Sequence, residues 1–233
     1  LVKAHQPRPE QKEVGEKKVK EVTDSDLSKM NTLYSDKEKE EIKEILQLSR
    51  DNTKEIIEFL KRPVEKEDLK IKLLKTLEKK DYRDIKEEVL REHLNYSLPY
   101  EKEYEEDIFI SYLLKPRVHT EAITKYRQFI EDSYPESVKE AFRKEPELIW
   151  QDIRERVIER PDLENNNLIT VPKGCLLIGA GNLLSKKILF VSICRTIGIP
   201  ARLNKIDLSM EYYKGDRFHN ICKKDSPKAS LIL

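Results

Sequence analysis

Three side chains near the C-terminal end of the chain have the chemistry for nucleophilic catalysis: Cys175, Ser185 and His219. A thiol or hydroxyl attacks a carbonyl carbon efficiently only when a nearby base takes its proton or a positive charge stabilises the thiolate. Cys175 with His219 is the most plausible nucleophile–base pair. The Ser185 hydroxyl would need a base close to it in the folded chain.

Each candidate nucleophile also has a plainer structural interpretation. Cys175 follows the turn-like residues 171–174, so we expect a part-buried loop cysteine, with catalysis as the alternative. Ser185 lies near the start of a predicted helix, where serine is a favoured N-terminal cap. We therefore expect it to cap the helix rather than to attack a substrate.

A second group of polar residues, Arg117, His119, Glu121 and Arg127, surrounds Pro116 and Tyr126. The favoured interpretation is an ion network of Arg117, Glu121 and Arg127 that braces the helical part of the chain. The alternative is a site for an acidic or sugar ligand, since the planar guanidinium group binds such ligands with paired hydrogen bonds. His119 is interpreted as a polar surface or interface residue.

An apolar run from Leu184 to Cys194 must position the candidate nucleophiles. It is apolar on most sides, which predicts a deeply buried helix. The helix closes on Arg195, and Gly198 with Pro200 stops it before an extended Ala-Arg-Leu segment.

The stretch Arg195-x-x-Gly198-Ile-Pro200-Ala-Arg202 resembles the signature of the transglutaminase-like superfamily, a branch of the papain-like cysteine fold. In that family a Gly-x-Cys at the start of the central helix supplies the nucleophile, twelve positions before the first arginine. Here Gly181 matches the glycine, and the nucleophile position holds Leu183. The resemblance therefore implies a degenerate member that lacks the nucleophilic cysteine. Ser185-Lys186 is similar to a bacterial subgroup with Leu-Ser and a basic residue there.

The resemblance also implies a catalytic histidine on a strand after the Gly-Ile-Pro-Ala-Arg turn, which only His219 can match. The family places an acidic residue on the following strand, and Asp225 is too close to His219 to fill that position. Residues 229–233 are apolar and predict a further strand, so we expect an unfinished sheet in a fragment of a longer protein.

The composition excludes several classes of protein. Lys+Arg number 45 and Asp+Glu 44, and this balance argues against a nucleic-acid partner. No apolar run is long enough for a transmembrane segment. The spacing of Cys175, Cys194 and Cys222 matches no zinc pattern, so no metal or cofactor is expected. A cytoplasmic location and export after removal of a leader both stay open.

The distribution of glycine and of apolar residues suggests three segments. Residues 1–34 are predicted to be a disordered or peripheral leader, 35–160 a helical region, and 170–233 a partial transglutaminase-like core. Ser35-x-x-Glu38 and Asn52-x-x-Glu55 have the form of capping boxes at helix starts.

These patterns predict an α+β fold in which a helical N-terminal region leads into an incomplete transglutaminase-like core. We expect a catalytically impaired protein that acts as a binding or scaffold module for a peptide or carbohydrate ligand. The alternative is an active cysteine acyl-transferase or peptidase acting on protein amides. By the family mechanism it would form an acyl-enzyme and transfer the acyl group to an amine or water.

Overall fold

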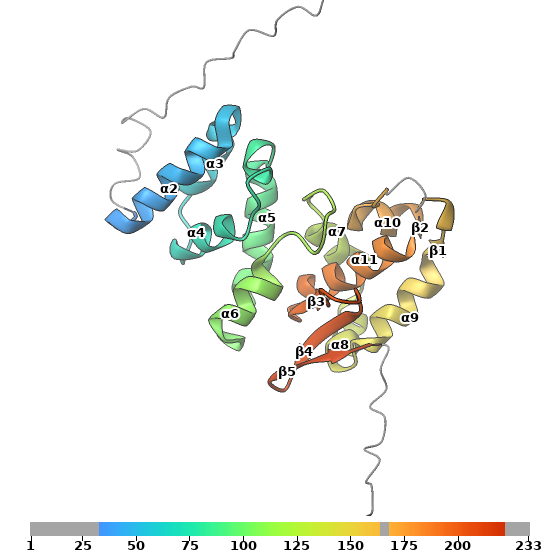
Figure 1. Ribbon diagram of the computed structural model, residues 1–233. Helices are drawn as coiled ribbons and strands as arrows, with labels where there is room; N and C mark the ends of the chain where they lie inside the picture. Colours follow the sequence, from blue (N-terminus) through green and yellow to red (C-terminus); the bar gives the residue numbers. More distant parts are fainter. Residues whose placement is uncertain (1–32, 164–167, 222–233) are drawn as a thin grey trace, which may run out of the picture.

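The computed structural model has an α+β fold and describes residues 33–163 and 168–221. Figure 1 shows two groups of helices, with the strands in the second group. The expected leader at 1–34 lies almost wholly outside the described residues. Cys222, Asp225 and the strand expected at 229–233 lie outside them too.

The first group is helical throughout. Its α-helices are α2 (Asp36–Ser49), α3 (Thr53–Lys61), α4 (Asp68–Lys75), α5 (Glu87–Ser97) and α6 (Glu106–Phe109). Short helical turns connect them: η1 (Arg50–Asn52), η2 (Asp81–Arg83), η3 (Leu98–Glu103) and η4 (Ile110–Leu114).

The two predicted capping boxes have different outcomes. At α2 the box is confirmed, because the Ser35 and Glu38 side chains each accept a hydrogen bond from the other's backbone N–H. At α3 the prediction is wrong, because Asn52 makes no capping bond. Its Nδ2 instead donates to the carbonyl oxygens of Tyr82 and Ile85. Asn52 thus ties the start of α3 to the segment around η2.

The apolar faces of these helices form one hydrophobic core, which η4 completes. Burying such faces is the main favourable contribution to folding. The fully enclosed side chains include Ile56, Leu60, Leu73, Leu74, Leu90, Leu94, Leu113 and Leu114.

The second group contains both helices and strands. Its helices are α7 (Arg127–Ser133), α8 (Glu136–Lys144), α9 (Glu147–Arg156), the turn η5 (Pro161–Leu163), α10 (Pro172–Ile178) and α11 (Leu183–Thr196). Its strands are β1 (Ile158–Glu159), β2 (Ala180–Gly181), β3 (Ala201–Leu203), β4 (Met210–Lys214) and β5 (Arg217–Asn220). β1 and β2 form a short parallel pair, and β3, β4 and β5 form an antiparallel sheet in that order.

Helix α11 is the centre of this group, as its apolar sequence predicts. From Ile188 to Thr196 every side chain is buried. It packs against α7, α9, α10 and the first two strands of the antiparallel sheet (Figure 1). In that sheet Ala201 pairs with Tyr212, and Tyr212 pairs in turn with His219.

The two hydrophobic cores divide between Leu114 and Tyr126. Helices α7, α8 and α9, which the sequence groups with the helical region 35–160, contribute their apolar side chains to the core around α11. That core therefore begins well before residue 170, because α11 needs covering on several sides.

Two buried arginines cross the junction between the cores. The Arg195 guanidinium donates to the carbonyl oxygens of Lys115, Arg117 and Ala201, at 2.7 to 3.1 Å. Arg127 donates to the carbonyl oxygens of Arg195 and Leu113. Burial lowers the pKa of Arg195 to about 10, so both groups stay charged at neutral pH.

Two residues of α5 complete this junction. The Nε of Arg127 donates to Nδ1 of His93, so His93 carries its proton on Nε2 and donates it to the Thr124 carbonyl. A carboxylate oxygen of Glu92 accepts the backbone N–H of Arg127 at 2.6 Å, which caps the first turn of α7. The junction therefore depends on an uncharged histidine.

Gly198 lies at a second contact between the cores. Its φ of +90° is in the left-handed region, and a Cβ atom there would come within 2.3 Å of the Tyr100 ring. Its carbonyl oxygen accepts a hydrogen bond of 2.8 Å from the Tyr104 hydroxyl. Both tyrosines belong to the η3 region, so the glycine stop after α11 is also where the first group packs on the second.

Replacing Gly198 with alanine is expected to destabilise the protein strongly. Gly215 provides a matched control, because its φ of +56° is also left-handed but nothing lies within 4 Å of its Cβ position. We expect Gly215→Ala to lower the free energy of unfolding by about 1 kcal/mol, and Gly198→Ala by roughly 3 kcal/mol because overpacking adds to the backbone strain. Urea unfolding measures both, and equal losses would contradict the role of the Tyr100 contact.

Stability is expected to fall as the pH drops from 6.5 towards 5. Burial, together with the neighbouring Arg127, holds the pKa of His93 well below its usual 6.5. The unfolded chain then binds a proton in this range that the folded chain does not, so the unfolding free energy declines by up to ~1.4 kcal/mol per pH unit. In His93→Gln the amide oxygen still accepts from Arg127 but does not titrate. Urea unfolding at several pH values should show the decline in the wild type only, and the same slope in both proteins would refute this origin.

Candidate functional site

The start of α11 is where the family resemblance places a nucleophile, and the structure puts Leu183 at the first position of the helix. Asn182 caps this helix. Its Oδ1 accepts the Ser185 backbone N–H at 2.7 Å, and its Nδ2 donates to the Leu168 carbonyl. The expectation that Ser185 is the cap is therefore wrong.

Ser185 is buried and engaged with the backbone. Its hydroxyl oxygen accepts a hydrogen bond of 2.9 Å from the N–H of Thr170. No hydrogen bond joins it to a histidine or carboxylate among the described residues. The hydroxyl holds the segment before α10 against α11, and no neighbouring group is placed to take its proton.

Cys175 approaches the start of α11 in space, although it lies in helix α10 rather than in a loop. A Cβ atom on Gly181 would come within 2.9 Å of the Cys175 sulfur, so the two residues are in direct contact. The side chain is fully buried, and burial raises the pKa of the thiol to about 11 against the opposing effect of Lys186. At neutral pH Cys175 is thus a protonated, enclosed thiol.

Lys186 is the cation closest to this thiol, and its charge is already balanced. The side chain is almost completely buried, with Nζ 3.6 Å from a carboxylate oxygen of Glu159 and 5.9 Å from the centre of the Trp150 ring. The pair fastens α11 to β1.

His219 lies on β5, away from this cluster. Its Nε2 donates to the carbonyl oxygen of Lys214 at 3.0 Å, and its ring stacks on Tyr212 at 5.5 Å. Figure 1 places α10 and β5 at opposite ends of the second group. No hydrogen bond links His219 to Cys175 or Ser185 in the described part of the chain. The structure therefore does not bring the three candidate catalytic residues together.

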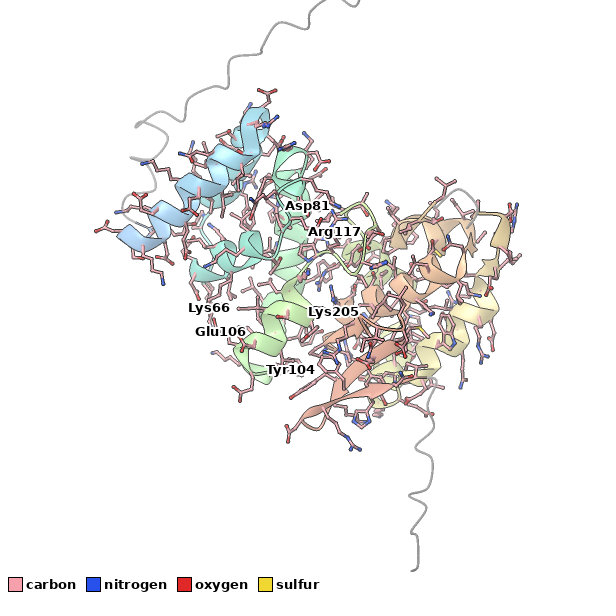
Figure 2. The ribbon with its side chains drawn as sticks, in the orientation of Figure 1. Lys66, Asp81, Tyr104, Glu106, Arg117 and Lys205 are labelled. Atoms are coloured by element: carbon pink, nitrogen blue, oxygen red, sulfur yellow. The ribbon has the colours of Figure 1, made fainter. Side chains whose placement is uncertain are left out.

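The second polar group acts as a brace, with partners that differ from the expected ones. Arg117 pairs with Asp81 of η2 and donates to the backbone carbonyl of Glu121 (Figure 2). The Glu121 carboxylate accepts the backbone N–H groups of Val118 and His119 at 2.6 and 2.8 Å. Arg127 does not join this network, since its guanidinium binds carbonyl oxygens in the junction.

Three residues with exposed apolar side chains lie on backbone segments that meet near the start of α11. Ile178 and Leu183 are 71% and 38% exposed, and Ile158 of β1 is 69% exposed. Hydrogen bonds hold the backbone segments together, because the Ile158 N–H donates to Gly179 and Asn182 donates to Leu168. Large apolar side chains gathered in this way are typical of surfaces that contact other molecules.

Sequence reasoning missed a cavity at the other end of α11, where Arg195 is among the lining residues. It has a volume of about 510 Å³ and lies between η4, the segment 115–119 and β3. Lys115, His119, Arg202 and Lys205 line it. Only the folding of two segments about ninety positions apart brings Lys115 close to Arg202 and Lys205, so no local sequence pattern could have indicated the site.

The described residues contain no cluster of histidine, cysteine and acidic side chains arranged to hold a metal ion. Nor do they include a helix with the length and apolar character that crossing a membrane requires.

Comparison of the chain with protein-family models, curated proteins and solved structures finds no match. The assignment of function therefore rests on the geometry described above.

Proposed function

We propose that the chain is a degenerate transglutaminase-like protein that has lost its nucleophile and acts as a binding or scaffold module for a peptide ligand. The observation that carries the proposal is Leu183 at the first position of α11, where the family's thiol would benefit from the helix N-terminus. A leucine side chain cannot attack a carbonyl group.

The layout around α11 supports the family resemblance. A buried central helix ends at Thr196, directly after Arg195, and the chain turns through Gly198 into β3. An antiparallel sheet follows that carries His219 on its third strand. This is the order of elements that the resemblance implies. The signature residues also have structural roles, since Arg195 binds backbone carbonyls and Arg202 pairs with Glu211 at 2.7 Å.

The alternative of an active cysteine acyl-transferase or peptidase has less support. Cys175 is the one cysteine near the start of α11 in the described part of the chain, and its thiol is buried with a raised pKa. Cys194 is enclosed within α11, and burial raises the pKa of its thiol well above the usual value. Among the described residues, no histidine lies within hydrogen-bonding distance of either thiol.

The apolar surface around Ile158, Ile178 and Leu183 favours a peptide over a glycan. A peptide with apolar side chains can bury this surface and gain about 25 cal/mol for each Å² removed from water. A sugar would bring hydroxyl groups that need hydrogen-bond partners, and the large side chains here offer none. The ligand surface thus lies where the family would bind its substrate.

Thiol labelling tests the loss of catalysis. In a Cys222→Ser background, we expect iodoacetamide at pH 7 to leave Cys175 and Cys194 unlabelled until the protein unfolds, because both thiols are buried and protonated. Leu183→Cys is the positive control, since an exposed thiol at a helix N-terminus has a lowered pKa. Leu177→Cys places an exposed thiol in the last turn of α10, where no helix N-terminus lowers its pKa.

The expected order of labelling rates at pH 7 is Leu183→Cys, then Leu177→Cys, then the native thiols, as measured by peptide mass spectrometry. Rapid and selective labelling of Cys175 in the folded protein would contradict the proposal and favour the active enzyme.

A displayed library of random peptides tests the binding surface. We expect the wild-type protein to enrich peptides with apolar side chains, and Ile178→Lys to lose them because a charge then lies in the middle of the surface. Leu33→Lys makes the same change at another exposed apolar position. It should enrich the same peptides as the wild type. Retention of the peptides by Ile178→Lys would argue against this surface as the site.

A further inference from the structure

The cavity between the two groups of helices has a one-sided charge. Its lining residues include Lys115, Arg195, Arg202 and Lys205, and no aspartate or glutamate is among them. Figure 2 labels Lys205 between the strands of the second group and the helical segment formed by α6 and η4. A volume of about 510 Å³ is large enough to enclose a small organic molecule.

Among the described residues, an ion pair neutralises one of these positive charges, that of Arg202. Lys115 and Lys205 form no ion pair within the described residues, and Arg195 at the base binds only carbonyl oxygens. Two acidic side chains that interact with the lining arginines are already engaged. The Glu121 carboxylate accepts two backbone N–H groups, and the Glu211 carboxylate pairs with Arg202.

The neighbouring cations disfavour the charged form of Lys115, which is half-buried. Burial lowers its pKa, and the neighbouring Arg195, Lys205 and Arg117 lower it further, while Glu78 on the outside opposes them only in part. Bringing like charges together in a partly enclosed site is unfavourable, and a bound anion would relieve it.

The remaining walls of the cavity suit an organic group. The Tyr112 ring lies beneath Arg202, whose guanidinium carbon is 5.3 Å from the ring centre, and the Tyr112 hydroxyl accepts a hydrogen bond from Arg202. Val118, Leu203 and Leu208 add apolar surface. The cavity thus combines a cationic part with an aromatic and aliphatic part.

We propose that this cavity binds a small organic phosphate, with the phosphate oxygens between Lys115 and Lys205 and the organic group against Tyr112. A doubly charged phosphate matches the two unpaired ammonium groups, and lysine is a common partner of phosphate. The site is independent of the start of α11, so it stands whether or not the chain retains catalysis.

Binding of inorganic phosphate and of phenyl phosphate to the full chain tests the proposal, at constant ionic strength set with chloride. We expect saturable binding of both by calorimetry, with phenyl phosphate the tighter because its ring adds contacts with the apolar wall. Equal affinities would overturn the assignment to an organic phosphate. Heats no different from those of added chloride would overturn the site altogether.

Charge-removing variants locate the site. Lys115→Gln/Lys205→Gln should weaken phenyl phosphate binding by tenfold or more, in line with hydrogen bonds to charged groups worth about 1.5–3 kcal/mol. Lys37→Gln/Lys43→Gln removes the same charge from the exposed face of α2 and should leave the affinity unchanged. Equal weakening in the two double variants would refute the site.

Two further measurements keep the test decisive if the Lys115 substitution unfolds the protein. Lys205→Gln alone changes an exposed side chain and should still weaken binding several-fold. In the wild type, saturating phenyl phosphate should slow acetylation of Lys115 by an activated acetate ester without slowing that of Lys37. Unchanged affinity in Lys205→Gln, or unprotected Lys115, would overturn the proposal.

Discussion

The architecture depends on buried guanidinium groups that are held by backbone carbonyls. Arg195 closes the central helix and gathers the carbonyl oxygens of residues 115, 117 and 201, while Arg127 takes the carbonyl of Arg195 itself. A buried charge is tolerated only when its hydrogen bonds are satisfied. These hydrogen bonds therefore fix the connecting segment 115–121 and the start of β3 in place against α11.

The same arrangement shapes the cationic cavity. The segment that Arg195 holds forms one wall of the cationic cavity, and β3 forms the other. At the far end of α11, Asn182 and Ser185 hold the segment before α10, at Leu168 and Thr170. The side chains that would serve catalysis in the family are thus occupied with packing, and the exposed features of the chain are apolar at one end and cationic at the other.

Local patterns in the sequence predicted much of the fold. The α+β class, the capping box at Ser35, the buried helix through Arg195 and the stop at Gly198 all follow from short-range spacing and backbone preference. The structure contains each of them, and the helix ends one residue after Arg195, at Thr196.

Several errors concern residues whose partners lie far along the chain, whereas those at Ser185 and Cys175 are local. Asn52 has the form of a cap but bonds to residues some thirty positions away. Arg127 was expected to pair with an acid and instead binds carbonyl oxygens, and Cys175 lies in a helix under Gly181. The sequence could not predict the cavity for the same reason, because its lysines lie far apart along the chain and come close only in the folded structure. Whether the fold belongs to the transglutaminase-like superfamily stays a prediction from the signature.

The cap that Glu92 supplies to α7 has a consequence for folding. A helix of seven residues is too short to persist alone in water, because few hydrogen bonds offset the cost of nucleation. Helix α7 therefore forms only when α5, thirty-five positions earlier, is in place to accept its first N–H. Since α7 also covers α11, the Glu92 cap couples the second hydrophobic core to the first.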